Sequence, residues 1–368
     1  MAGPREQAPL PPGLAAWLDD AAHGLDTAAD DATAVLPRLG DAGLFRIGVP
    51  VALGGSGGDV TDAVRAVAAV SERSLAAGFV FWGQRTFIEY LLQSPNEGLR
   101  ARLLPALLEG RRAGATGLSN AMKFLAGFEE LQLKASAADR ALRIDGKLPW
   151  VTNLQPTGFD VAAAVEGAGD DPAFIVSLSS DDDGVSRSAD LDLMALRATS
   201  TAAIKIDDAR VGAERILHPD AHAWLPKVRP AFLGLQCGMS IGLARSALTE
   251  TEAKLRSGRD VLAEPFAAIS AELADLHARL ARGLAAAVFE TEPSLLFRLR
   301  IRLAEVVAEA VQLELCASGG AAYLTQPGAG IQRRLRESAF VPVVTPSLVQ
   351  LKTALAAHPR VAAVGAVA

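Results

Sequence analysis

The spacing of hydrophobic residues changes twice along the chain. In the first part the pattern is helical, and one predicted helix is well delimited. Ser94 is followed directly by Pro95, and Glu97 lies three positions after the serine. This pattern predicts Ser94 as the N-cap of that helix. The helix carries four leucines between Leu99 and Leu107 and ends at Gly110. We therefore expect this first part to be helical.

From about Arg112 the hydrophobic period becomes two, which is the period of a half-buried strand. The predicted strands are residues 131–136, 142–145, 173–176 and 203–206. Loops rich in aspartate, serine and glycine separate the later strands. Asp145 and Gly146 form a dipeptide that favours a tight hairpin turn between two alternating runs. The pattern predicts a β domain inserted between helical ones.

After about Pro219 the helical period returns and continues toward the C-terminus. Ile269, Leu273, Leu276 and Leu280 recur at three- and four-residue steps. Long helices with short connections indicate a helix bundle. A chain of 368 residues also exceeds the size at which a single core usually stops growing, so two or three domains are expected.

Composition and charge narrow the classes of partner. Hydrophobic residues make up 50% of the chain and charged residues 21%, which supports a large core or an oligomer interface. A formal charge of −6 gives no electrostatic footprint for nucleic acid or for an anionic membrane. No apolar run reaches membrane-spanning length, and the N-terminus lacks the apolar centre of a signal peptide. We expect a soluble, cytoplasmic protein that binds neither nucleic acid nor membranes.

The cysteines and histidines do not predict a metal site. Cys237 and Cys316 lie in apolar, helix-like contexts, so we expect two buried free thiols. His218 and His222 have an i, i+4 spacing, but Pro219 interrupts the segment between them. No bound metal is therefore predicted.

The segment from Leu148 to Asn153 contains a tryptophan and a threonine two positions apart. On a strand Trp150 and Thr152 point to the same face, an arrangement that also occurs in ordinary core packing. With Gly146 before it, the segment resembles the flavin-facing strand of the acyl-CoA dehydrogenase superfamily, whose pattern is G-x-K-x-W-I-T-N. The resemblance implies that Trp150 packs beside the flavin ring and that Thr152 offers a hydroxyl to its reactive nitrogen.

Other segments resemble the same superfamily and occur in its order. They are residues 39–58, 207–217, 269–275 and 319–340. Together they imply an α+β, mainly helical, multidomain fold. It would have an N-terminal helical domain over residues 1–111, a central β-barrel-like domain over 112–218 and a C-terminal four-helix bundle over 219–368. Members of the family usually pair through the bundle, so a homodimer or homotetramer is expected.

The resemblance also assigns residues to a site for FAD. Ser119 stands at the hydroxyl position of the family's first flavin strand, although the G-S-D that follows in the family is missing here. Arg256 resembles the arginine that reaches the FAD of a neighbouring subunit. Gly319 and Gly320 fit a close approach of the backbone to the adenosine phosphates. Ser347 completes the predicted cofactor-binding set with Trp150 and Thr152.

The catalytic residues depart from the family pattern. The glutamate that removes a proton beside the thioester carbonyl corresponds to Thr345 here, and a threonine hydroxyl has no useful basicity near neutral pH. The second position that relatives use falls within residues 226–230, which contain no carboxylate. The catalytic base is therefore unassigned. Thr345, Arg85 and Ser347 are predicted to line the substrate pocket.

Three functions are compatible with these residues. The first, which we expect, is an FAD-dependent oxidoreductase of the acyl-CoA dehydrogenase type, with a thioester of CoA or of a carrier protein, or a related small molecule, as substrate. It would need an electron-transfer partner. The second is a flavin-dependent monooxygenase that uses reduced flavin and O2, depends on a flavin reductase and requires no carboxylate base. The third is a non-catalytic descendant of the fold.

Overall fold

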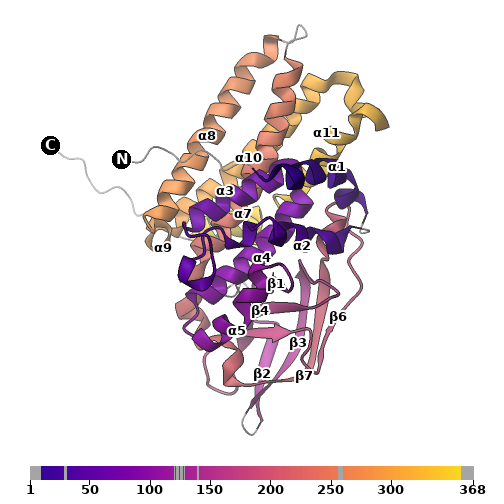
Figure 1. Ribbon diagram of the computed structural model, residues 1–368. Coiled ribbons are helices and arrows are strands. Elements are labelled where there is room, and N and C mark those ends of the chain that lie inside the picture. Colours follow the sequence, from indigo (N-terminus) through magenta and orange to yellow (C-terminus); the bar gives the residue numbers. More distant parts are fainter. Residues whose placement is uncertain are drawn as a thin grey trace, which may run out of the picture.

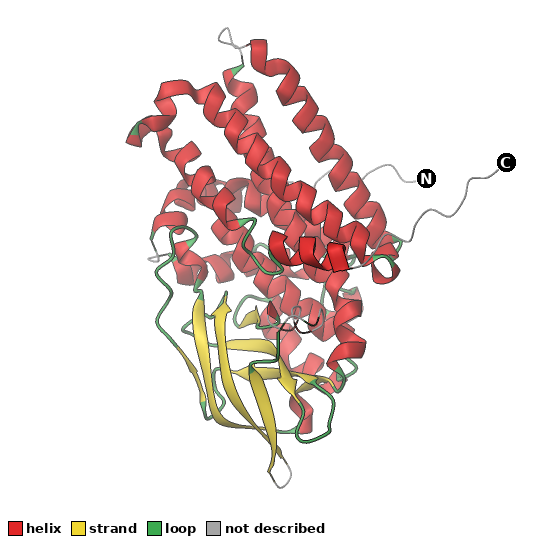
Figure 2. Ribbon diagram, turned by 180° about the vertical axis from the view of Figure 1, so that it is seen from behind, coloured by secondary structure: helices red, strands yellow, loops and turns green. Residues whose placement is uncertain are grey.

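The structure is a computed structural model of the chain, in which a helical body carries a curled sheet at one end (Figure 1). It describes residues 10–28, 31–119, 121, 124, 127, 129–138, 141–255 and 260–357. Seen from behind, the strands gather at the end opposite the tips of the long C-terminal helices (Figure 2). The predicted fold class, mainly helical with a central curled sheet, is confirmed. The division into domains at residues 111 and 218 stays a prediction.

Five α-helices are described in the N-terminal region between residues 10 and 111. They are α1 (Pro12–Thr27), α2 (Ala32–Asp41), α3 (Val60–Arg73), α4 (Leu75–Gln93) and α5 (Glu97–Leu108). Asp59 caps α3 in a capping box with Asp62, and Ser74 caps α4. Nearly every side chain of α4 is buried, so this helix is the centre of the region. It carries Phe79 and Trp82 into the interior.

The predicted start of α5 was wrong by two residues. Asn96 is the N-cap, and its side-chain oxygen accepts a 2.9 Å hydrogen bond from Leu99 N. Ser94 instead accepts from Asn96 N at 3.1 Å and donates to Leu217 O at 2.6 Å. Ser94 thus connects the residues just before α5 with Leu217, near the end of the sheet. This is a tertiary contact that the local sequence does not encode.

The described residues form eight strands of one sheet. They are β1 (Ala113–Thr116), β2 (Leu133–Ala138), β3 (Ala141–Val151), β4 (Phe159–Glu166), β5 (Phe174–Ser179), β6 (Val185–Arg187), β7 (Ala202–Val211) and β8 (Ile216–His218). Their order is β6-β7-β3-β2-β4-β5-β8, and β1 pairs in parallel with β4. β5 and all but the last residue of β4 are buried, whereas β7 largely alternates, so the sheet is covered on both faces on the side of β4 and β5 and on one face on the side of β7.

The hairpin predicted at Asp145 and Gly146 was also wrong. β3 continues through both residues, and the β2–β3 connection lies between Ala138 and Ala141. Gly146 has a φ of 139° and sits at a register irregularity against β7. A Cβ at this position would lie 2.1 Å from Gln132 O, so glycine permits a close approach of two strands.

The C-terminal region is a helix bundle. Its helices are α7 (Ala221–Lys254), α8 (Ala263–Ala285), α9 (Val288–Thr291), α10 (Pro293–Ser318), α11 (Thr325–Phe340) and α12 (Leu348–Ala357). α7 crosses α3 closely because Gly238 and Gly242 have no side chains. A Cβ on Gly242 would lie 2.3 Å from Ala68 O. This crossing joins the two helical regions across more than 150 residues of sequence.

Both cysteines are free, but they differ in exposure. Cys237 is buried on α7, and burial raises the pKa of its thiol to about 12. Cys316 is exposed on α10, so the prediction that both thiols are buried was wrong for this residue. On the same helix Leu313 and Ala317 are buried, so Cys316 lies at the edge of the buried face. In the described part of the chain, no helix combines the length and apolar composition required to cross a bilayer.

Acidification is expected to weaken the bundle through His277 on α8. Burial, Arg245 and Arg65 together lower its pKa to about 4, and Arg245 donates a 3.1 Å hydrogen bond to Nδ1. Between pH 6.5 and 4, His277 is protonated in the unfolded chain but stays neutral in the folded chain. The free energy of unfolding therefore decreases as the pH falls. We expect this residue to contribute a loss of about 1–2 kcal/mol, discounted for its partial exposure.

The measurement is urea unfolding of the wild type and of His277→Gln at several pH values from 7 to 4. The variant should lose less stability than the wild type over this range, because its side chain does not titrate. Parallel pH profiles for the two proteins would contradict the assignment.

Candidate functional site

A cavity of about 760 Å³ opens where the end of β3, the N-terminal helix α4 and the chain around the end of α11 meet. Its volume is in the range of small-molecule sites. Phe79 and Trp82 from α4 and Phe340 from α11 form its aromatic base. The ring centroid of Phe79 lies 5.3 Å from that of Trp82 and 4.6 Å from that of Phe340. The base is thus a rigid apolar floor.

Large apolar side chains around this cavity are unusually exposed. The exposed fractions are 63% for Trp150, 68% for Met194, 64% for Val343 and 75% for Val349. All four line the cavity. Clustered exposed apolar surface at a concave site is typical of a surface that a ligand covers. Because Trp150 presents a flat aromatic face, the rim is suited to a planar ring system.

The structure brings together five of the predicted site residues. Trp150 and Thr152 come from the end of β3, and Ser119 follows β1. Thr345 and Ser347 come from the segment between α11 and α12, almost 200 residues later. All five line the one cavity. Their roles toward a ligand stay predictions.

Four predicted residues lie elsewhere or are not described. Gly319 and Gly320 form the turn after α10 and do not belong to the cavity lining. Arg256 lies outside the described residues. Arg85, on α4, is fully buried and does not line the cavity either.

Arg85 has a structural position instead of the predicted place in the substrate pocket. Its guanidinium donates to Ile47 O at 3.2 Å, to Gly48 O at 3.0 Å and to Glu89 at 2.8 Å. A buried guanidinium is costly unless it is paired and hydrogen-bonded, and these three bonds supply that compensation. Arg85 therefore fastens the loop before α3 onto α4. The helical position was correctly expected, but the direction of the side chain depends on tertiary packing.

Two buried side chains of the bundle hold the segment that carries Thr345. Gln236 on α7 donates to Thr345 O at 3.0 Å and accepts from Arg300 Nε at 2.8 Å. Arg300 on α10 also donates to Val341 O at 2.6 Å, and burial lowers its pKa. The wall of the cavity at Thr345 is thus fixed by hydrogen bonds to backbone carbonyls rather than by packing alone.

Two charged residues of the lining were not assigned to the site from the sequence. Arg336 on α11 and Glu129 both line the cavity, and Glu129 is the carboxylate among the described lining residues. Arg336 donates through Nε and NH2 to one oxygen of Asp26, at 2.8 and 2.6 Å. The other oxygen of Asp26 accepts from Leu196 N at 3.1 Å. Asp26, fully buried on α1, thereby joins α11 to the loop that carries Leu196, which also lines the cavity.

The end of β3 is anchored by Asn153. Its side-chain amide donates to Gln84 Oε1 and to Gly114 O, each at 3.0 Å. Its φ of 64° is a left-handed value that asparagine tolerates better than most residues. Asn153 N donates to Thr199 O at 2.9 Å. These bonds fix the direction in which Trp150 and Thr152 leave the sheet.

The lining residues fit the ring system of a flavin. An aromatic face, a rim of exposed apolar side chains and hydroxyls at Thr152 and Ser119 are the groups that a flat, mostly apolar heterocycle with polar edges requires. The described titratable lining groups are one arginine and one glutamate. The site thus supplies shape and hydrogen bonds more than proton-transfer groups.

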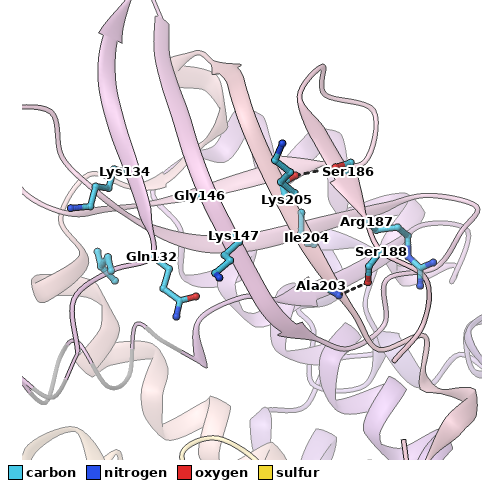
Figure 3. A pocket seen from close by; sticks show the side chains of 11 residues that line it. Gln132, Lys134, Gly146, Lys147, Ser186, Arg187, Ser188, Ala203, Ile204 and Lys205 are labelled. Carbon is cyan, nitrogen blue, oxygen red and sulfur yellow. Dashed lines mark hydrogen bonds between the residues drawn. The ribbon is translucent and has the colours of Figure 1, made fainter. Parts of the chain in front are cut away.

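A second hollow, of about 810 Å³, lies on the face of strands β2, β3, β6 and β7 (Figure 3). Its lining includes Lys134, Lys147, Arg187 and Lys205. Lys134 pairs with Glu166 at 3.2 Å, Lys205 pairs with Asp207 at 2.7 Å, and Arg187 pairs with Asp190. These carboxylates neutralise most of the positive charge, so the hollow is not organised as an anion site.

Comparison with known proteins places the chain in a family. Residues 14–111 match the family described as acyl-CoA dehydrogenase, N-terminal domain. The mitochondrial isovaleryl-CoA dehydrogenase of Pongo abelii is 29% identical over 189 residues, which are 49% of this chain and 44% of that protein. The chain thus spans less than half the length of that relative. The probable acyl-CoA dehydrogenase YngJ of Bacillus subtilis (strain 168) is 24% identical over 326 residues, with 83% and 84% of the two chains covered.

Solved structures share the fold over nearly the whole chain. The prolyl acyl carrier protein oxidase AnaB has a TM-score of 0.79 at 15% identity, with 97% of this chain and 99% of AnaB covered. KijD3 in complex with FMN and dTDP-3-amino-2,3,6-trideoxy-4-keto-3-methyl-D-glucose has a TM-score of 0.77 at 19% identity, with 95% and 94% covered. The chain belongs to the acyl-CoA dehydrogenase superfamily.

Proposed function

We propose that this protein is an FAD-dependent oxidoreductase of the acyl-CoA dehydrogenase type that acts on an acyl thioester of CoA or of a carrier protein. The observation that carries the proposal is the convergence of Trp150, Thr152, Ser119, Thr345 and Ser347 on one cavity. Family membership and the likeness to AnaB, a prolyl acyl carrier protein oxidase, support the thioester. The likeness to KijD3, whose structure is a complex with FMN, supports a flavin.

In this proposal the chain's residues bind and orient, and the flavin supplies the two-electron redox chemistry when bound. Trp150 would pack against a bound flavin, and the hydroxyls of Thr152 and Ser119 would offer it hydrogen bonds. The aromatic base formed by Phe79 and Trp82 excludes water from the reacting face. Arg336, paired with the buried carboxylate of Asp26, shapes the cavity wall at the end of α11.

A flavin-dependent monooxygenase that uses reduced flavin and O2 is the second candidate. The observation that favours it is the identity of Thr345, which lines the cavity where the family's base is expected. Oxygen transfer from a reduced flavin needs no carboxylate to remove a proton from carbon. In this case a separate flavin reductase is the partner. A dehydrogenase instead needs a base to remove a proton from carbon. Among the described lining residues, Glu129 is the carboxylate that could serve as this base.

A spectroscopic titration tests the proposal. The purified protein is mixed with FAD or FMN, and a panel of acyl-CoA and acyl-carrier thioesters is added without oxygen. Bleaching of the oxidised flavin band by one thioester would support the dehydrogenase. Flavin binding without bleaching, followed by oxygen-dependent product formation with added reductase, would support the monooxygenase. Failure of any flavin to bind would contradict both and leave a non-catalytic descendant.

Removal of the aromatic face is expected to weaken flavin binding. Trp150→Ala should raise the dissociation constant of FAD about tenfold or more, because it removes a large apolar contact area from the ring. The measurement is quenching of FAD fluorescence during titration with protein. Trp17→Ala, on α1 and outside the cavity lining, is the matched control and should leave the affinity unchanged. Equal affinities for the wild type and Trp150→Ala would contradict the placement of the ring.

A further inference from the structure

Three threonine hydroxyls form a chain that ends at the cavity. Thr152 Oγ1 lies 2.5 Å from Thr201 Oγ1, and Thr201 Oγ1 lies 2.7 Å from Thr199 Oγ1. Thr199 Oγ1 in turn donates to Leu196 O at 2.8 Å. All three threonines are buried, and Thr152 and Thr201 line the cavity. The chain therefore runs from a backbone carbonyl to the surface that a ligand contacts.

The direction of the protons in this chain follows from its far end. A carbonyl oxygen only accepts, so the single hydroxyl proton of Thr199 is used by Leu196 O. In the bond between Thr199 and Thr201, Thr199 must therefore be the acceptor, and Thr201 donates its single hydroxyl proton. Thr201 in turn can only accept from Thr152. The proton of Thr152 therefore points away from the cavity, and Thr152 presents only lone pairs to a ligand.

Backbone bonds hold the far end in this arrangement. Leu196 and Ser200 have left-handed φ values of 56° and 47°, which the local sequence does not favour. Leu196 N donates to Asp26, and Leu154 N donates to Ser200 O at 3.0 Å. The loop from 196 to 201 is thus clamped to α1 on one side and to the chain after β3 on the other. The orientation of the hydroxyl chain is built into the fold.

We propose that Thr199 and Thr201 are positioning residues that make Thr152 a hydrogen-bond acceptor, so that the site binds reduced flavin in preference to oxidised flavin. The inference rests on the proposed binding of a flavin in this cavity. Two-electron reduction of a flavin places a proton on a central-ring nitrogen that is bare in the oxidised form. An acceptor facing that ring edge gains a hydrogen bond with the reduced form and opposes a lone pair in the oxidised form.

The test compares the affinities of the two redox states. Dissociation constants of oxidised FAD and of dithionite-reduced FAD are measured without oxygen for the wild type and for Thr201→Val. The wild type should bind reduced FAD more tightly. In Thr201→Val the proton of Thr152 is free to turn toward the ligand, so oxidised FAD should bind more tightly and the preference should fall about tenfold. The midpoint potential of bound FAD should fall correspondingly by about 30 mV.

Two further variants separate orientation from structural damage. Thr201→Ser keeps the hydroxyl and should keep the preference of the wild type. Thr251→Val removes a buried threonine hydroxyl that is bonded within α7, outside the cavity lining, and should also leave the preference unchanged. If Thr201→Val does not fold, Thr152→Val should reduce the preference by weakening the binding of reduced FAD.

The outcomes distinguish this inference from the function on which it rests. If the wild type binds neither form of FAD, the proposed function and the inference both fail. If both forms bind equally well to the wild type, or if Thr201→Val keeps the full preference, the inference alone is overturned. A preference that falls in Thr201→Val and persists in Thr201→Ser supports it.

Discussion

Replacing Glu314 by alanine is expected to lower the free energy of unfolding by about 3–5 kcal/mol. Glu314, fully buried on α10, accepts two bonds from Arg334 on α11, at 2.7 Å from Nε and 2.5 Å from NH2. Lys254 lies 3.6 Å away. The variant leaves the guanidinium of Arg334, which is only 7% exposed, without its bidentate partner in a poorly solvated place. Chemical denaturation measures the loss.

A surface pair provides the control for Glu314→Ala. Glu305, on the same helix, pairs with Arg302 and Lys352, but its side chain is 41% exposed. Glu305→Ala should change the free energy of unfolding by less than about 1 kcal/mol. A double variant, Glu314→Met with Arg334→Leu, should be more stable than Glu314→Ala because no charge is left unpaired. If Glu314→Ala costs no more than Glu305→Ala, the buried pair is not a determinant of stability.

The order of the structural elements was predictable because it depends on local periodicity. The switch from helix to strand near Arg112 and back near Pro219 matches the start of β1 at Ala113 and of α7 at Ala221. Those patterns arise from which face of each element is buried. β1, β4, β6 and β8 were not among the predicted strands, and β4 is buried on both faces, so it shows no alternation. Among the local features predicted for these elements, one cap and one turn were wrong. Ser94 and Gly146 carry ordinary local signals that longer-range contacts override.

The site was predictable only where a residue belongs to a recognisable motif. Trp150 and Thr152 were predicted as site residues because they lie two positions apart in a predicted strand. Thr345 was predicted because it follows the segment 319–340, which resembles a family motif. Asp26 and Arg336 are 310 positions apart, and Asp26 and Leu196 are 170 apart. No periodicity or spacing encodes such contacts. They arise only when α1, α11 and the loop before β7 pack together.

A second large loss of stability is expected for Asp26→Asn, about 2–3 kcal/mol. Asp26 lies in the last turn of α1, where a negative charge opposes the helix dipole, so the substitution would favour the isolated helix. A net loss must therefore come from tertiary contacts. Asparagine keeps the size and can still accept from Leu196 N, but it removes the charge that pairs with Arg336.

The measurement for Asp26→Asn is again chemical denaturation, followed by FAD titration of the folded variant. Asp19→Asn is the matched control on the same helix, because Asp19 pairs with Arg73 at the surface with 54% of its side chain exposed. It should cost less than about 1 kcal/mol. Flavin affinity should fall in Asp26→Asn but not in Asp19→Asn, since Arg336 and the loop at Leu196 both form walls of the cavity. If the two variants are equally stable, the link from α1 to the cavity wall does not contribute, and the walls must be held by the bundle contacts at Thr345 and Val341 alone.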